Sequence, residues 1–234
     1  MKNLILIFLL LGVFNSGWSQ TPDYTVIFGE DWKKAEVFEK ENRTWIEPIL
    51  IKNHISYPLA MSVVFPEILR YSALRDKMEV SLLKTLYVNL GEEYADFSVG
   101  IYQMKPSFAE TIREETSAFL GNRAGIKFKT ASAYADVKDF RRSIIKDLDD
   151  PESQVIYLIA FIRLCEKKFD LKRFSDVSQV KFISTAYNYG IDKTMAQIMK
   201  MADKKFFSTK IIKSETYSYS EISIYWYKQF NSSR

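Results

Sequence analysis

The sequence predicts a mainly α-helical fold, built as a single domain around a buried central helix. Apolar residues recur at helical spacing along most of the chain, and Gly91, Gly121 and Gly190 each follow such a segment, where a helix C-terminus favours glycine. Val155–Cys165 is apolar on nearly all sides, which is typical of a helix in the middle of a domain.

Composition excludes several classes of protein. The 234 residues are 47% hydrophobic and 26% charged, as in an ordinary globular protein. A formal net charge of +4, spread evenly, is too small to indicate nucleic-acid binding. Cys165 and His54 are the only cysteine and the only histidine, so no internal disulfide can form, and most zinc sites and thiol or serine triads are excluded. We therefore expect neither a metal nor a cofactor.

Residues 1–20 are expected to be a signal peptide. Lys2 supplies a positive start, Leu4–Phe14 is the apolar stretch, and small residues at Gly17 and Ser19 offer a cleavage site. The alternative is a membrane anchor, but the apolar stretch is short for a bilayer span. We expect an exported protein, periplasmic or extracellular, with no stable membrane insertion after cleavage.

Residues 21–56 are expected to form an N-terminal arm that precedes the domain at 57–234. Thr21–Glu30 is predicted to be a flexible or extended lead-in, and Asp31–Lys40 has a helical pattern. Ile46–Ile51 is apolar and is interrupted by Pro48.

The domain begins with a helix that Pro58 opens. Glu67 lies at position i+7 of an aliphatic stripe on this helix, which consists of Ala60, Val63 and Val64. The stripe places the Glu67 carboxylate on an apolar face, although a helix-end charge that reaches water is the simpler interpretation. Pro66 is expected to kink the helix or to restart it.

A second helix is predicted over Leu74–Leu90, with Leu74, Met78, Leu82, Leu86 and Leu90 on one stripe. An acidic stretch and a turn at Ser98–Gly100 follow, and Pro106 opens a helix that runs to Leu120.

Further helices are expected to the end of the chain. Their predicted spans or starts are Asp136–Leu148, a start at Asp150–Pro151, one from Ser175 or Asp176 to Tyr187–Gly190, one capped by Asp192, and Tyr217–Tyr227, where a strand is the alternative.

Three stretches carry residues suited to sugar chemistry. Glu67 on an apolar face could hold a proton at neutral pH, as a glycosidase acid must. In Ser98–Pro106, Gly100 would let a ligand approach the backbone, Gln103 offers a donor and an acceptor, and Tyr102 or Met104 offers an apolar wall. The third stretch is Ala186-Tyr187-Asn188-x-Gly190. Taken alone, the last two stretches could be an ordinary turn and a capped helix end.

In this order, the three stretches resemble the lysozyme-like domain of the soluble lytic murein transglycosylases, over about Tyr57–Gly190. The resemblance implies that Glu67 protonates the β-1,4 bond between N-acetylmuramic acid and N-acetylglucosamine. The same glutamate would then act as base on the muramyl 6-hydroxyl, which gives a 1,6-anhydro product. The substrate-binding residues would be Ser98, Gly100, Tyr102, Gln103, Met104, Tyr187 and Asn188. The resemblance also implies that the Tyr187 hydroxyl bonds Glu67 and that the partner is the glycan strand of peptidoglycan.

The chain departs from this family in several places, and its N-terminal arm and its Tyr217–Arg234 tail have no counterpart there. Ile68 follows Glu67 where many members have serine, and the Leu74–Gly91 segment replaces a short loop. Two alternatives remain open. One is a lysozyme-type muramidase, with Glu92, Glu93 or Asp96 activating water. The other is a catalytically silent glycan-binding protein of the same fold.

Overall fold

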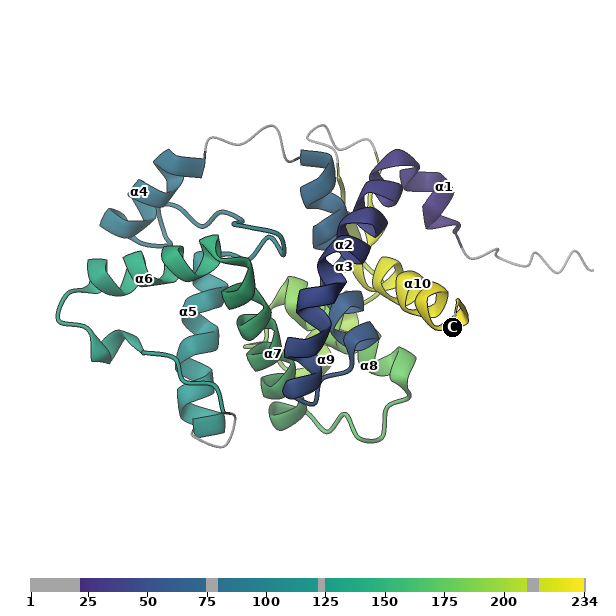
Figure 1. Ribbon diagram of the computed structural model, residues 1–234. Helices are drawn as coiled ribbons and strands as arrows, with labels where there is room; N and C mark the ends of the chain where they lie inside the picture. The colour runs from purple at the N-terminus through teal and green to yellow at the C-terminus, as the bar shows by residue number, and fades with distance from the viewer. Residues whose placement is uncertain (1–21, 75–79, 122–124, 210–214, 234) are drawn as a thin grey trace, which may run out of the picture.

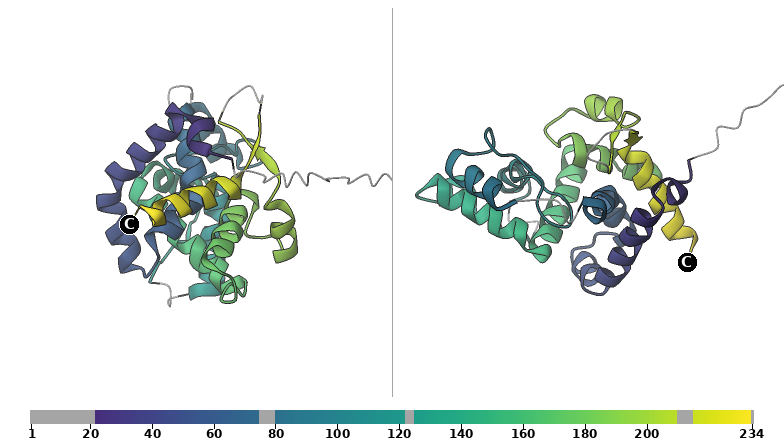
Figure 2. Two further views of the ribbon diagram at one scale, coloured as in Figure 1. Left: turned by 90° about the vertical axis from the view of Figure 1, so that its right-hand side faces the viewer. Right: turned by 90° about the horizontal axis from the view of Figure 1, so that it is seen from above.

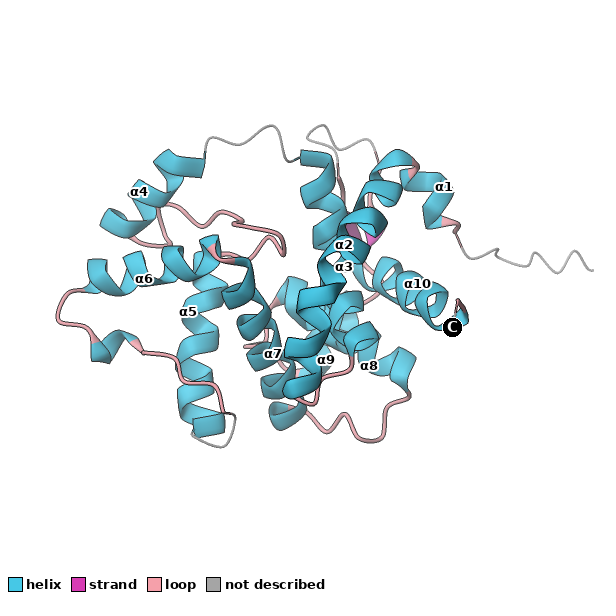
Figure 3. Ribbon diagram, viewed as in Figure 1, coloured by secondary structure: helices cyan, strands magenta, loops and turns pink. Residues whose placement is uncertain are grey.

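The computed structural model describes residues 22–74, 80–121, 125–209 and 215–233. They form ten α-helices, short π and 3₁₀ turns and one two-stranded sheet, which confirms the mainly α prediction (Figures 1 and 3). The predicted signal peptide at 1–20 lies outside the described residues. None of the helices within these ranges combines the length and the apolar character that a bilayer span requires.

The N-terminal segment is helical from the start, so the expected extended lead-in is wrong. Asp23 caps α1 (Tyr24–Phe28) by accepting the backbone N–H groups of Thr25 and Val26. After the turn at Gly29, α2 (Glu30–Lys52) continues through Pro48 without ending. Helix α2 packs against α3, and its buried Trp32 contacts the Phe65 ring of α3.

Helix α3 (Tyr57–Leu74) carries the predicted glutamate and contacts α2, α7, α8 and α10 (Figure 2). It contains Pro66 inside its span, so the helix does not restart there. The residues around the proline are fully buried on more than one face: Ala60, Met61, Val63, Val64, Phe65, Ile68 and Leu69. Packing on all sides holds α3 together despite the backbone donor that Pro66 lacks.

At one end of the molecule lie α4 (Val80–Leu90), α5 (Pro106–Glu115) and α6 (Val137–Asp149) (Figure 1). α5 continues into a π-helical turn, Thr116–Leu120, so the predicted limits at Pro106 and Leu120 are confirmed. A 3₁₀ turn at Ala131–Ala133 precedes α6, which Asp136 caps through the Lys138 N–H.

The predicted stripe of leucines on the second helix is wrong in part. Leu82 and Leu90 are exposed, whereas Tyr87 is fully buried and its hydroxyl donates to Glu110 of α5. Leu83, Leu86 and Tyr87, at spacing i, i+3 and i+4, therefore form the buried face of α4. The predicted start at Leu74 is wrong, because Leu74 is the last residue of α3 and α4 begins at Val80 in the described residues. The stripe also included Met78, which lies outside the described residues.

The second half of the chain contains α7 (Pro151–Lys168), α8 (Asp176–Tyr189), α9 (Met195–Met201) and α10 (Tyr219–Ser232). Asp150 and Ser175 cap α7 and α8 as predicted, but Thr194, not Asp192, caps α9, in a capping box with Gln197. The tail is helical as predicted, although its helix begins at Tyr219 and not at Tyr217. Its preceding strand β2 (Tyr217–Ser218) pairs antiparallel with β1 (Lys205–Phe207).

Candidate functional site

The three stretches that the sequence singles out meet at one pocket of about 90 Å³. The pocket lies where α3, the 98–105 loop, the start of α5 and the end of α8 come together. Its lining residues are Glu67, Arg70, Ser98, Gln103, Met104, Lys105, Phe108, Tyr187 and Asn188. Of the predicted site residues, only Gly100 and Tyr102 are absent from this lining.

Glu67 is the buried acid of the pocket, with 4% of its surface exposed. One nitrogen of the Arg70 guanidinium donates to both carboxylate oxygens, at 3.1 and 2.8 Å. Burial raises the pKa of Glu67, while the charge and hydrogen bond of Arg70 and the nearby Tyr219 hydroxyl lower it, and burial prevails. Glu67 therefore has the buried environment of a proton donor, and the Arg70 cation opposes its protonation.

Arg70 was missed in the sequence. It lies three residues after Glu67 on the same helix, a spacing that brings the two side chains together. That spacing was the available signal. The Glu67 carboxylate, expected on an apolar face, is in fact buried in an ion pair with the half-buried Arg70.

The turn before α5 is held in one conformation by hydrogen bonds within it. Val99 and Met104 exchange backbone hydrogen bonds of 2.9 and 3.1 Å, and Gly100 and Gln103 have positive φ angles of 71° and 49°. The Gln103 side chain donates to the Gly100 carbonyl at 2.8 Å, which fixes it at the edge of the pocket. The Gln103 amide, which the sequence predicted as a donor and acceptor for a ligand, is thus held in one position.

Packing against a neighbouring side chain requires glycine at position 100, which the sequence did not reveal. A Cβ at this position would lie 1.6 Å from Nε2 of Gln154, so the neighbour that approaches the backbone is a glutamine of α7. Gln154 is buried, accepts the Tyr102 N–H at 3.0 Å and donates to the Leu148 carbonyl. It thereby joins the turn to the end of α6. A polar residue just before the apolar run of α7 was the only hint of this role.

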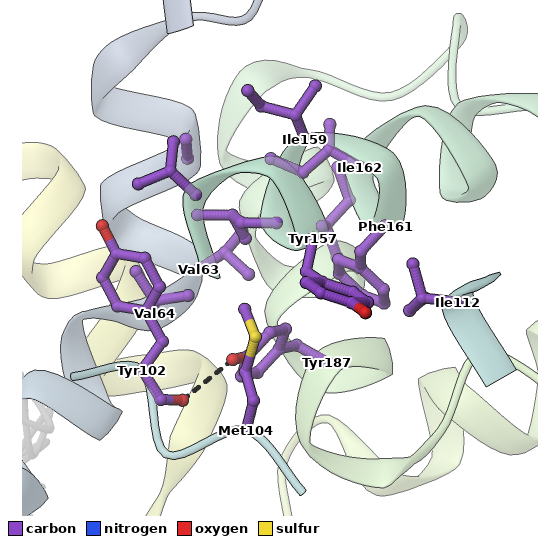
Figure 4. Packing of buried hydrophobic residues seen from close by; sticks show 14 of the residues in the cluster. Val63, Val64, Tyr102, Met104, Ile112, Tyr157, Ile159, Phe161, Ile162 and Tyr187 are labelled. Atoms are coloured by element: carbon purple, nitrogen blue, oxygen red, sulfur yellow. Dashed lines mark hydrogen bonds between the residues drawn. The ribbon is translucent and has the colours of Figure 1, made fainter. Parts of the chain in front are cut away.

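Tyr102 and Tyr187 support the pocket from the core (Figure 4). The Tyr102 side chain is fully buried, with its hydroxyl 4.0 Å from the Met61 sulfur, so it is not the expected apolar wall of the pocket. The Tyr187 hydroxyl donates to the Tyr102 backbone carbonyl at 2.9 Å. The expected bond from Tyr187 to Glu67 is therefore replaced by a bond to the loop, and Tyr187 anchors that loop to α8.

The C-terminal segment, which the sequence left without a role, forms the wall behind Glu67. The Tyr219 hydroxyl donates to the Val63 carbonyl at 3.0 Å and lies near the Glu67 carboxylate, where it helps to lower the pKa of Glu67. The Phe207 ring lies under the Arg70 guanidinium, at 4.5 Å from carbon to ring centroid. The aromatic residues of this tail were the available signal.

The acidic stretch before the turn stands apart from the pocket. Asp96 accepts Lys105 Nζ at 3.0 Å and the Ser107 N–H at 3.2 Å, so its carboxylate is committed to holding the loop. Burial and the neighbouring Glu110 raise the pKa of Glu92. Among the residues that the structure describes, Glu67 is the only carboxylate that lines this pocket.

A second, wider groove of about 620 Å³ lies between α2 and α10. It contains Glu39, which is also buried and accepts the Tyr57 hydroxyl at 2.5 Å. Burial raises the pKa of Glu39, the Tyr57 bond lowers it, and burial prevails. The sequence did not point to this groove. Within the described ranges, no three His, Cys, Asp or Glu side chains are placed to hold a metal ion.

Comparison with known proteins identifies no relative. No protein-family model matches the chain, and neither a curated protein nor a solved structure matches it significantly. The resemblance described above therefore rests on the three sequence stretches alone.

Proposed function

We propose that this protein is an exported, cofactor-free lytic transglycosylase that cleaves the glycan strands of peptidoglycan. The observation that carries the proposal is the meeting of three distant stretches at one buried glutamate: Glu67, the turn with Ser98 and Gln103, and the helix end with Tyr187 and Asn188. We assign the domain to a lysozyme-like fold in which α7 is the central helix.

Glu67 performs both proton transfers in the proposed reaction. Its carboxyl O–H protonates the glycosidic oxygen, and the bond between C1 of N-acetylmuramic acid and that oxygen breaks with its electron pair on the oxygen. The resulting Glu67 carboxylate then takes the proton from the 6-hydroxyl of the same sugar. O6 bonds to C1, and the 1,6-anhydro ring closes without consuming water. Burial supports the first step because it disfavours the ionised form of Glu67.

The neutral polar groups of the pocket suit an acetamido sugar. Asn188 and Gln103 supply amide donors and acceptors, Ser98 adds a hydroxyl, and Met104 and Phe108 provide apolar surface. The pocket is small, at about 90 Å³, so most of a glycan strand would lie outside it.

Mass spectrometry of products tests this proposal. Purified peptidoglycan treated with the mature protein should release fragments that end in 1,6-anhydromuramic acid and are one water lighter than hydrolysis products. Reducing ends would instead identify a muramidase. A folded protein that binds the strands and releases nothing would identify a glycan-binding module.

Substitutions of the two buried tyrosines should have different effects. Tyr219→Phe removes a hydroxyl that lies near the Glu67 carboxylate and helps to lower its pKa, so the upper pH limit of activity should move to higher pH. Tyr187→Phe leaves the Tyr102 carbonyl without its donor, which should cost about 1–3 kcal/mol of stability and shift the pH profile less. Thermal melts and pH–rate profiles of both variants check this. A larger pH shift in Tyr187→Phe would favour the bond to Glu67 that the resemblance implies.

A further inference from the structure

The cation beside the buried acid has no assigned role in the reaction above. Arg70 forms a short ion pair with Glu67, at 2.8 Å between nitrogen and oxygen. Only 5% of the Glu67 side chain and 25% of the Arg70 side chain are exposed, so water screens this pair weakly. A positive charge in that position opposes protonation of the acid.

Arg70 is held there from the far end of the chain. Its guanidinium lies over the Phe207 ring at 4.5 Å, and Phe207 is fully buried in β1. The Phe207 ring packs edge-on against Tyr219, with ring centroids 5.7 Å apart. The β1–β2–α10 segment therefore holds Arg70 in place through Phe207, and it contributes Tyr219 beside the Glu67 carboxylate.

We infer that Arg70 is the positioning residue of this site: clamped between Glu67 and Phe207, it orients the acid and sets the pH above which the acid can no longer donate a proton. The inference rests on the proposed function, because it assigns Arg70 a part in that reaction. It also makes the C-terminal segment, through Phe207 and Tyr219, part of the working site.

The other groups that face Glu67 leave Arg70 as its principal cation. Tyr187 approaches from α8 and Tyr219 from α10, and burial, followed by the negative charge of Glu67, raises the pKa of both. Lys105 lines the same pocket from the loop before α5, but it is bound to Asp96. Lys105 is not among the groups that shift the pKa of Glu67, whereas Arg70 gives the largest opposing effect.

The test compares Arg70→Met with Arg70→Lys in the mature protein. Arg70→Met keeps an apolar stem against Phe207 and removes the charge, so the alkaline limb of kcat/KM for peptidoglycan should move to higher pH. An opposite charge within about 4–6 Å typically lowers a carboxyl pKa by one to three units. At a pH above the point where wild-type activity falls, the activity of Arg70→Met, relative to its own optimum, should therefore exceed that of the wild type about tenfold or more.

Arg70→Lys is the matched control, because it keeps the charge and loses the planar guanidinium. Its limb should stay near that of the wild type while kcat falls, because the acid is less well oriented. Identical limbs in wild type and Arg70→Met would overturn the inference. A purely structural role would lower the rate at all pH values and would leave the limb in place.

A second readout separates this inference from the proposed function. NMR titration of ¹³C-labelled glutamate carboxyls, with Glu67→Gln to assign the resonance, should show a higher midpoint for Glu67 in Arg70→Met. This measurement needs no substrate, so it decides the inference even if the protein cleaves nothing. If Arg70→Met does not fold, Phe207→Leu serves instead. It loosens the guanidinium, and an unchanged midpoint in that variant would contradict the clamp.

Discussion

Replacing Glu67 by glutamine should reduce the release of anhydro-muramyl products by about 10²- to 10⁴-fold, the range that a positioned general acid contributes. The amide cannot deliver a proton to the glycosidic oxygen or accept one from the 6-hydroxyl. Its oxygen can still accept from Arg70, which bonds the glutamate now. The variant should therefore fold normally, as circular dichroism can verify, while product release is followed by mass spectrometry.

Glu39→Gln is the matched control for this prediction. Glu39 is also a buried glutamate whose pKa is raised by burial, but it lies in the wider groove between α2 and α10. Its amide can accept the Tyr57 hydroxyl, so the fold should survive. We expect unchanged product release from Glu39→Gln. Loss of activity in this variant, with full activity in Glu67→Gln, would move the active site to that groove.

Gly100→Ala should be the most damaging single methyl addition among the described glycines. The added Cβ would lie 1.6 Å from Nε2 of Gln154 and 2.9 Å from the Leu148 carbonyl oxygen, and the backbone is held at φ 71°. Overpacking costs about 1–3 kcal/mol and a left-handed conformation adds about 1 kcal/mol or more. At about 2–4 °C per kcal/mol, the melting temperature should fall by roughly 5–15 °C, as calorimetry can measure.

Gly121→Ala provides the control for backbone strain alone. Gly121 has a similar φ of 53°, but no atom lies within 4 Å of the position of its added Cβ. It should lose only about 1 kcal/mol, the cost of the left-handed conformation. Equal losses in the two variants would mean that the Gln154 contact does not determine the glycine at position 100.

Several helix starts were predictable from sequence because their causes are local. Asp136, Asp150 and Ser175 each accept a backbone N–H within three residues, so the signal and the structure occupy the same short stretch. The five-residue helix α1 was missed because so short a segment carries little apolar periodicity.

The groups that interact with Glu67 were harder to predict. Phe207 and Tyr219 reach the site only because β1 and α10 fold back against α3, and no local pattern encodes that placement. The same holds for Gln154, whose contact with Gly100 joins residues 54 positions apart. The sequence thus indicated six residues of the pocket, Glu67, Ser98, Gln103, Met104, Tyr187 and Asn188, but not the network that holds them.

A crystal structure of Glu67→Gln with a bound peptidoglycan fragment would test the location and the chemistry of the site together. We expect the glycosidic oxygen within hydrogen-bonding distance of the residue 67 side chain, with the acetamido groups on Gln103 and Asn188 and the sugar against Met104 and Phe108. A fragment bound in the Glu39 groove, with the Glu67 pocket empty, would contradict the proposed active site.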